Sequence, residues 1–215
     1  FALVVIFSLL KLNSQVLYND AIVVSDCKIA SQVGLDILKK GGNAIDASIA
    51  TAFTLAVTLP SAGNIGGGGF IVFLNSDNES KTIDFREKAP INSTKGMFLD
   101  ESGNLIRGIN HNSVLSIGVP GTVAGLFFAH KKYGKLSWKK LIQPAIDIAN
   151  NGFIMTKGLY NSAKNVISKK QTFFLKNYFN NDQNEIVKPG EIWYQKKLAK
   201  TLEAIKDLSL IHISE

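Results

Sequence analysis

Arg86 is the residue of this sequence whose type and surroundings best suit ligand binding. It lies in the segment Asp84-Phe85-Arg86-Glu87, downstream of an apolar run and of four successive glycines at 66–69. A guanidinium presents a planar set of N–H donors that binds a carboxylate through two parallel hydrogen bonds. The spacing therefore indicates a carboxylate-binding arginine beside a glycine-lined surface. The alternative is an ordinary surface arginine that pairs with Asp84 or Glu87.

The glycine run predicts a close backbone approach at the start of a β-strand. Glycine loses more conformational freedom on folding than any other residue, so four in succession indicate a place where side chains would clash or φ must be positive. The apolar run 70–74 follows, and after a polar turn the segment 82–86 completes the pattern of a β-hairpin. Alternation along the second strand places Ile83 and Phe85 on one face, and Asp84 and Arg86 on the other. A phosphate-binding loop is disfavoured, because a strand and not a helix N-terminus follows the glycines.

The other residues that could carry catalysis each have a simpler structural interpretation. Cys27 is the only cysteine, which excludes an internal disulfide and a cysteine-based zinc site. Asp26 and Asp46 lie at predicted helix starts, where a carboxylate caps the first turn. The histidines are not at metal-ligand spacing, and the threonines of one buried helix are not chain N-termini (His111, His130, His212; Thr51, Thr54, Thr58). We therefore predict no catalytic residue, metal or cofactor in this chain.

Helices on both sides of the hairpin must position this arginine. A short strand is expected over 21–25, followed by a helix over 28–40 that has Asp26 or Ser25 as its N-cap and ends at two glycines. The small residues of 44–58 predict a closely packed, buried helix. Helical spacing predicts further helices over 122–133, 137–151, 156–170 and 194–206. Together these elements indicate an α+β fold.

Composition and charge restrict the function classes. The chain has 215 residues, 46% of them hydrophobic, and a formal net charge of +7. The excess is almost entirely lysine, without a basic stripe or a base-reading module, so nucleic-acid binding is disfavoured. The apolar stretch 1–10 has the length of the central region of a signal peptide and is too short to span a bilayer. We therefore predict a signal peptide over 1–17, truncated at its start, with no stable membrane span and export to the periplasm or the extracellular space.

Several motifs in a common order resemble the large subunit of the γ-glutamyltranspeptidase family. They occupy 32–38 with 41–47, 62–70, 84–90, 118–125, 133–134 and 143–153, and together they extend over about 21–206. Among them are Gly-Gly-Asn-Ala-Ile-Asp-Ala at 41–47, Asp-Phe-Arg-Glu at 84–87 and Gly-Val-Pro-Gly-Thr-Val-Ala-Gly at 118–125. Each motif is weak alone, and their common register makes the resemblance specific.

The resemblance implies an N-terminal-nucleophile hydrolase with an αββα sandwich, of which this chain would be an incomplete large-subunit portion. Residues 18–207 would form that portion, and 208–215 are atypical of the family. A precursor would cut itself into two subunits, and the new N-terminal threonine of the small subunit would be the nucleophile. This chain alone is therefore expected to be inactive. In the family, the arginine of Asp-Phe-Arg-Glu grips the α-carboxylate of the γ-glutamyl group, and Arg86 occupies that position.

The implied activity is transfer of the γ-glutamyl group from glutathione or related γ-glutamyl amides to water, an amino acid or a peptide. The implied partners are that small-molecule substrate and the small subunit of the same precursor, with no cofactor. Two alternatives stay open. One is an amidohydrolase on the same fold, such as a cephalosporin acylase or a poly-γ-glutamate-processing enzyme. The other is a non-catalytic module that binds a carboxylate through Arg86.

Overall fold

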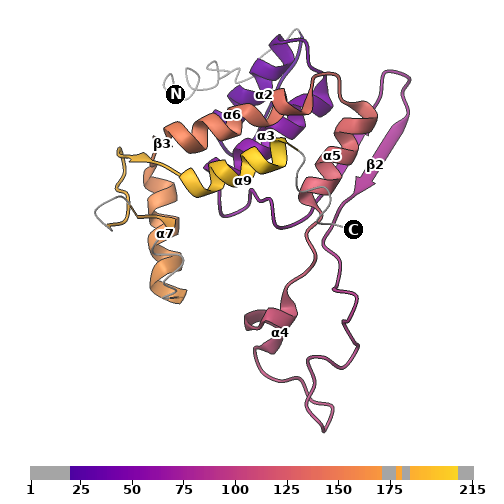
Figure 1. The fold of residues 1–215 in the computed structure, drawn as a ribbon, viewed down its shortest axis with the longest axis vertical. Helices are drawn as coiled ribbons and strands as arrows, with labels where there is room; N and C mark the ends of the chain where they lie inside the picture. Colours follow the sequence, from indigo (N-terminus) through magenta and orange to yellow (C-terminus); the bar gives the residue numbers. More distant parts are fainter. Residues whose placement is uncertain (1–19, 171–177, 181–184, 208–215) are drawn as a thin grey trace, which may run out of the picture.

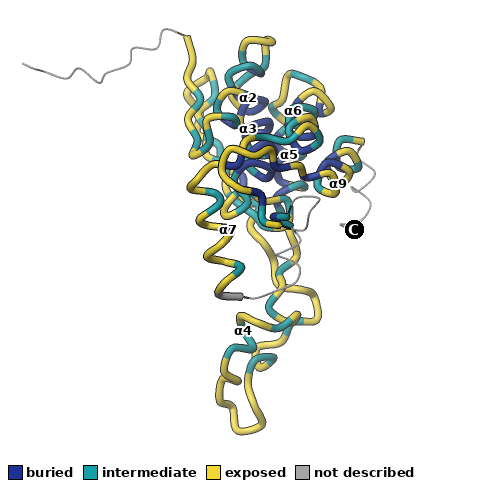
Figure 2. The backbone as a smooth tube through the Cα atoms, turned by 90° about the vertical axis from the view of Figure 1, so that its left-hand side faces the viewer, coloured by how far each residue is buried: buried dark blue, intermediate teal, exposed yellow. Residues whose placement is uncertain are grey.

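Packed helices form the main body of the molecule, with α3 (Ala44–Thr58) at its centre (Figure 1). The computed structural model describes residues 20–170, 178–180 and 185–207, so the predicted signal peptide and the atypical tail lie outside it. Helix α3 packs against α2 (Lys28–Lys39), α5 (Thr122–Tyr133) and α6 (Trp138–Asn151), and α6 packs in turn against α9 (Lys196–Lys206). Most of α3 is buried (Figure 2). Its small side chains let its neighbours approach closely. These helices confirm the sequence predictions to within two residues at each end.

Strands β1 (Phe70–Leu74) and β2 (Ser80–Asp84) form the predicted antiparallel hairpin, with Phe70 opposite Asp84. The Asn75 side chain closes the turn, because its Oδ1 accepts hydrogen bonds from the backbone N–H groups of Asp77 and Glu79 at 3.0 and 2.8 Å. Strand β2 ends at Asp84, whereas the sequence predicted that it continues to residue 86. Ile83 is nonetheless buried and Phe85 packs against the core, while Asp84 and Arg86 are exposed, which confirms the predicted alternation.

Residues 88–119 form an arm that protrudes from the helical body (Figures 1 and 2). Its base is closed by Lys88 and Val119, which exchange two backbone hydrogen bonds of 3.2 and 2.8 Å. The arm carries the short helix α4 (Ile109–Asn112) and the 3₁₀ turn η1 (Val114–Ser116). The chain leaves the body at Lys88 and returns to it at the paired Val119, so the arm is a long loop whose two ends are hydrogen-bonded to each other.

A second, smaller cluster of buried side chains surrounds Trp193. Strand β3 (Phe153–Ile154) pairs antiparallel with β4 (Ile192–Trp193), and α7 (Lys157–Lys170) follows β3. Burial raises the pKa of Tyr178 in this cluster to about 12, and its hydroxyl donates to Gln195 Oε1 at 2.6 Å. Gln195 Nε2 donates in turn to the carbonyl oxygen of Val57 at 2.7 Å, which ties this cluster to α3.

Residues 21–25 are extended but do not form the predicted strand. Within the described part of the chain this segment has no partner strand and makes no backbone–backbone hydrogen bond. Its side chains still alternate, because Val23 is half-buried while Ile22 and Val24 are exposed. The predicted N-cap of α2 is also wrong: Cys27 holds that position without a side-chain hydrogen bond, and the Ser25 hydroxyl lies 2.8 Å from that of Ser31.

No helix in residues 20–170, 178–180 and 185–207 combines the length and the apolarity that crossing a bilayer requires.

Asp46 joins two connections between helices that are far apart in the sequence. Its carboxylate is fully buried and accepts hydrogen bonds of 3.1 Å from the backbone N–H groups of Asn43, Lys135 and Leu136. Asn43 completes the capping box of α3, since its Oδ1 accepts from Asp46 N at 3.0 Å, and its Nδ2 donates to Tyr133 O at 2.6 Å. The predicted helix-start role of Asp46 is confirmed, and the same carboxylate also anchors the α5–α6 connection.

Asp46→Asn is expected to lower the free energy of unfolding by about 2–3 kcal/mol. The substitution replaces a charged carboxylate with a neutral amide, and the amide NH₂ group cannot accept hydrogen bonds from the backbone N–H groups that surround it. Urea denaturation of the complete protein measures this change. Asp36→Asn is the matched control, since the Asp36 side chain accepts only from Gln32 Nε2 on an exposed helix face, and it should cost less than about 0.5 kcal/mol. Equal losses in both variants would contradict the anchoring role.

Candidate carboxylate-binding site

Arg86 lies two residues beyond the end of β2 and lines a pocket of about 670 Å³ where the arm meets the body. The side chain is exposed, so its guanidinium is open to solvent and to ligands. The pocket walls come from the segment that carries Arg86 and from both sides of the arm, and they comprise Glu87, Lys88, Ala89, Pro90, Ser93, Thr94, Met97, Phe98, Leu115, Ser116, Ile117 and Gly118.

Two glycine-containing turns hold the backbone that carries Arg86: the glycine run at 66–69 and the turn before α5, at 118–121. Phe85 N donates to Gly69 O at 3.0 Å, which extends the hairpin ladder by one bond beyond β2. On its other side, the same segment is bonded to the turn before α5 through the Lys88–Val119 pair at the base of the arm. The two turns are also bonded to each other, because Gly67 O accepts hydrogen bonds from Gly121 N at 2.7 Å and from Thr122 N at 3.0 Å. Arg86 thus extends from a segment that is fixed on both sides.

The Asn64 side chain adds a third connection between these turns. Its Oδ1 accepts a hydrogen bond of 2.8 Å from Gly67 N and one of 2.6 Å from the Thr122 hydroxyl. One oxygen atom therefore joins the start of the glycine run to the first residue of α5.

Glycine is required in both turns because the backbones touch. A Cβ atom on Gly68 would lie 2.7 Å from Arg86 Cα and 2.7 Å from Glu87 N, closer than real Cβ contacts come. A Cβ atom on Gly121 would collide with the carbonyl oxygen of Phe85. The predicted close approach of the glycine run to another backbone segment is confirmed, and that segment is the one that bears Arg86.

The Arg86 guanidinium has no carboxylate partner within 4.0 Å in the described part of the chain. Asp84 instead accepts a hydrogen bond from the backbone N–H of Arg86 at 3.0 Å, which fixes the main chain and not the guanidinium. The alternative of a surface ion pair with Asp84 or Glu87 is therefore wrong. A cation without an internal anion, at the edge of a pocket, is suited to an anionic ligand group.

Among the described residues, His111, His130 and Cys27 do not line the Arg86 pocket. His130 Nε2 lies 2.7 Å from Leu136 O and its ring packs near Trp138, so it stabilises the α5–α6 connection. His111 lies in α4 on the arm, Cys27 is the N-cap residue of α2, and His212 is outside the described residues. Nowhere in the described residues do three His, Cys, Asp or Glu side chains gather as they would around a metal ion.

The threonines of α3 form hydrogen bonds within the helical body. The Thr54 and Thr58 hydroxyls donate to carbonyl oxygens one turn back in their own helix, at 2.8 and 3.0 Å, and Thr51 donates to Ala30 O at 3.4 Å. Asp26 is exposed and lies on a different pocket. None of these residues contributes to the surroundings of Arg86.

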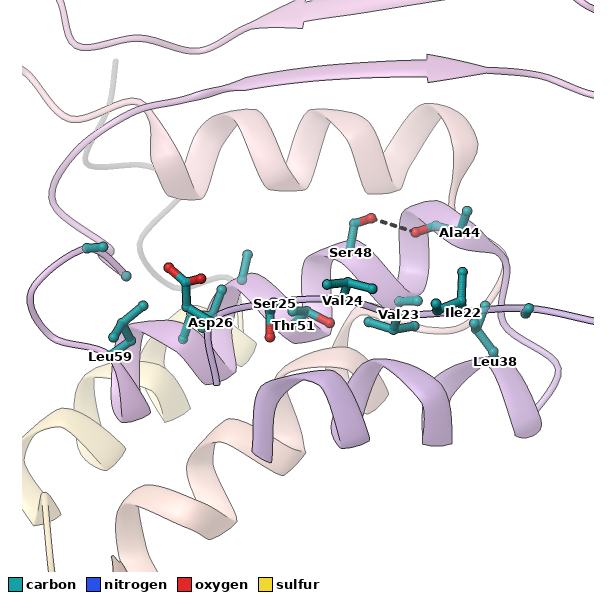
Figure 3. A pocket seen from close by; sticks show the side chains of 16 residues that line it. Ile22, Val23, Val24, Ser25, Asp26, Leu38, Ala44, Ser48, Thr51 and Leu59 are labelled. Carbon is teal, nitrogen blue, oxygen red and sulfur yellow. Dashed lines mark hydrogen bonds between the residues drawn. The ribbon is translucent and has the colours of Figure 1, made fainter. Parts of the chain in front are cut away.

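A second pocket, of about 950 Å³, runs along α3 beneath the extended segment 21–26 (Figure 3). Leu38, Leu55 and Leu59 supply apolar walls, and small residues of α3 form much of its floor. Ser48 contributes little polarity, because its hydroxyl donates to Ala44 O at 2.8 Å. The pocket is thus a mostly apolar groove beside residues 21–25, whose backbone edge is unpaired in the described part of the chain.

Sequence reasoning missed Asn64 and Thr122. Each lies inside a motif that was recognised, but the two residues are 58 positions apart, and no local spacing connects them. The available signal was the polar side chain two residues before the glycine run and the hydroxyl directly after Gly121, at the start of a helix.

Comparison with known proteins supplies the context for this site. The family model described as gamma-glutamyltranspeptidase matches residues 30–210. The glutathione hydrolase proenzyme of Pseudomonas sp. (strain A14) is 44% identical over 191 residues, which are 87% of this chain and 33% of that protein. The chain thus spans about a third of the length of this curated relative.

Solved structures show the same relationship. The gamma-glutamyltranspeptidase of Helicobacter pylori matches with a TM-score of 0.84 and 41% identity, over 90% of this chain and 56% of that one. The cephalosporin acylase of Bacillus halodurans matches with a TM-score of 0.71 and 26% identity, over 90% of this chain and 38% of that one. The resemblance inferred from the motifs and the predicted α+β, N-terminal-nucleophile hydrolase fold are confirmed.

Gly68→Ala is expected to lower the free energy of unfolding by about 1–3 kcal/mol, because the added methyl group meets backbone atoms that do not yield easily. The midpoint of thermal unfolding would fall accordingly. Gly66→Ala is the control within the same run, since a Cβ atom there meets no heavy atom within 4 Å, and its midpoint should stay the same or rise slightly. Equal unfolding midpoints for both variants would show that the close contact of Gly68 with the Arg86 backbone does not require glycine.

Proposed function

The chain belongs to the γ-glutamyltranspeptidase family, and on this premise we propose that the complete protein transfers γ-glutamyl groups from glutathione and related γ-glutamyl amides to water, amino acids or peptides. The observation that carries the proposal is the exposed Arg86 guanidinium, held on a rigid backbone at the edge of a pocket and without an anionic partner in the described chain. The names of the relatives, glutathione hydrolase and gamma-glutamyltranspeptidase, support the substrate class.

In this proposal Arg86 binds the α-carboxylate of the γ-glutamyl group. Two parallel N–H···O hydrogen bonds from the guanidinium would fix both the position and the rotation of that carboxylate. Since the carboxylate is the far end of the γ-glutamyl group, holding it in place would also fix the reacting γ-carbonyl group. Positioning of this kind lowers the barrier of acyl transfer, because the entropy of aligning the reactants is lost on binding and not in the transition state.

The chemical step would use groups outside this chain. A threonine at the N-terminus of the small subunit would attack the γ-carbonyl carbon, with its own α-amine as the base, and would form an acyl-enzyme while the amine product leaves. Backbone donors would stabilise the negative charge on the carbonyl oxygen of the tetrahedral intermediate. Attack by water or by an acceptor amine on the acyl-enzyme would then release the γ-glutamyl product and restore the threonine.

We propose that the small subunit of the same precursor covers the open side of residues 18–207. Among the described residues, nothing pairs with the backbone edge of the extended segment 21–25, and the neighbouring groove of about 950 Å³ along α3 is mostly apolar. On the hairpin, the outward residues Phe70, Val72 and Leu74 are 59%, 75% and 63% exposed. A row of exposed large apolar side chains is typical of a surface that another protein segment covers. A free edge with apolar neighbours suits pairing with further β-strands.

Export is also part of the proposal. The apolar stretch within 1–17 has the character of a signal peptide, and we propose that it directs the protein to the periplasm or the extracellular space.

The second candidate is an amidohydrolase that shares this fold and takes another substrate. The structural match to a cephalosporin acylase favours it, at lower identity than the match to the transpeptidases. A carboxylate-binding Arg86 is compatible with either substrate, so kinetics on the complete enzyme separate the two. A carboxylate-binding module without catalysis is the remaining alternative, and it predicts no turnover of any amide.

Arg86→Ala in the complete protein is expected to lower kcat/KM for a γ-glutamyl anilide by roughly 30- to 1000-fold, which corresponds to about 2–4 kcal/mol for one partner of a desolvated charge pair. Arg86→Lys should recover only part of the loss, because a lysine cannot form the bidentate contact. Arg107→Ala is the matched control, since Arg107 is the only other arginine and lies exposed on the arm. Self-cleavage with no γ-glutamyl activity in the unsubstituted enzyme would favour another amide substrate, and activity that survives in Arg86→Ala would contradict the proposed role.

Val24→Asp is expected to prevent stable association of the two subunits. Val24 is 80% exposed in the described chain, so an aspartate costs little there, but the proposed interface would bury the new charge without a partner. Size-exclusion chromatography of the complete protein measures the associated fraction. Normal association and activity in this variant would show that the small subunit does not cover this edge.

A further inference from the structure

We infer that Asn64 and Thr122 are positioning residues for Arg86, and this inference rests on the proposed function. Neither side chain lines the pocket beside Arg86. Both lie where the glycine run meets the start of α5. Their contribution is to fix the distance between the two turns that hold the Arg86 backbone.

The geometry of one oxygen atom supports this assignment. Asn64 Oδ1 accepts hydrogen bonds from Gly67 N at 2.8 Å and from the Thr122 hydroxyl at 2.6 Å. Thr122 is only 6% exposed, so water has little access to replace Asn64 as its partner. Because both donors meet at one atom, Gly67 and Thr122 are not free to move apart without losing at least one hydrogen bond.

The segment that bears Arg86 contacts both of these turns. Gly68 lies against Arg86 Cα, and Gly121 lies against the carbonyl oxygen of Phe85. Each of these glycines is next in sequence to a residue that the Asn64 side chain holds, namely Gly67 and Thr122. A change in the distance between the turns is therefore transmitted to the Arg86 backbone through direct contact.

Such a displacement matters for bidentate binding more than for folding. A guanidinium must present two N–H groups in the plane of the carboxylate, and a functional group of this kind tolerates only about 0.5 Å and 10–20° of misplacement. Loss of the Asn64–Thr122 hydrogen bond should thus weaken recognition of the substrate α-carboxylate specifically. A donor substrate that lacks this carboxylate should be insensitive to the change.

The test compares two anilide substrates in the complete enzyme. One is a γ-glutamyl anilide and the other is the 4-aminobutanoyl anilide, which is the same molecule without the α-carboxylate. The ratio of their kcat/KM values measures carboxylate recognition and is independent of the fraction of enzyme that matured. Thr122→Val removes the hydroxyl and keeps the shape, and we expect the ratio to fall about 3- to 10-fold, mainly through KM for the γ-glutamyl substrate.

Three further variants complete the design. Thr122→Ser restores the hydroxyl and should bring the ratio to within about twofold of the unsubstituted enzyme. Asn64→Ala removes the shared acceptor, and it provides a second measurement of the ratio if Thr122→Val does not cleave itself into two subunits. Thr58→Val is the matched control, because Thr58 is equally buried and its hydroxyl donates only to Thr54 O within α3, so its ratio should not change.

The outcomes separate the inference from the proposed function. If Arg86→Ala abolishes the preference for the carboxylate while Thr122→Val and Asn64→Ala keep it, the inference is overturned and the proposed function stands. If Arg86→Ala itself keeps the preference, the proposed role of Arg86 fails, and the inference fails with it. A loss in Thr58→Val as large as that in Thr122→Val would also overturn the inference, since general packing would then explain the effect.

Discussion

The site depends on a contact between backbones that leaves no room for a Cβ atom. The segment that carries Arg86 touches Gly68 on one side and Gly121 on the other. Ordering a glycine run is unfavourable by roughly 0.5–1 kcal/mol per residue relative to alanine, and the hydrogen bonds of Gly67 and Gly69 to the facing segments offset part of that. The result is a fixed backbone beneath a long, flexible side chain, so the proposed ligand would have to order only the side chain of the arginine.

Helix α5 connects this backbone segment to the helical body, because both of its ends are held. At its N-terminus, Thr122 bonds to Asn64 and to Gly67 O. At its C-terminus, Tyr133 O accepts from Asn43 Nδ2, and the Tyr133 ring packs on Phe73 of the hairpin with 4.8 Å between the ring centroids. The capping box of α3 and the hairpin thus act on the same helix, so the position of Arg86 follows from the packing of the main core.

Features encoded by neighbouring residues were predictable from the sequence, and features that need a distant partner were not. The bounds of α3 and the presence of the hairpin follow from periodicity and from Pro60, the glycines and the polar turn, all of which are local. The segment 21–25 has the alternation of a strand, but a strand also needs a neighbour to pair with. Arg86 could be proposed as a ligand-binding residue from the sequence because its chemistry is visible in one residue. Asn64 and Thr122 could not, because the hydrogen bond that joins them forms only where the glycine run meets the start of α5.

The bridge between Lys88 and Val119 has an evolutionary consequence for the arm. Because these residues are bonded to each other, the chain leaves the body and returns to it at one fixed point. The entropy cost of closing a loop rises slowly, by about 0.6 kcal/mol for each doubling of its length. Insertions, deletions and substitutions in the arm can therefore accumulate without moving the base of the site. Since the arm also supplies walls of the Arg86 pocket, the lining of the proposed ligand site can diversify while the arginine stays in place.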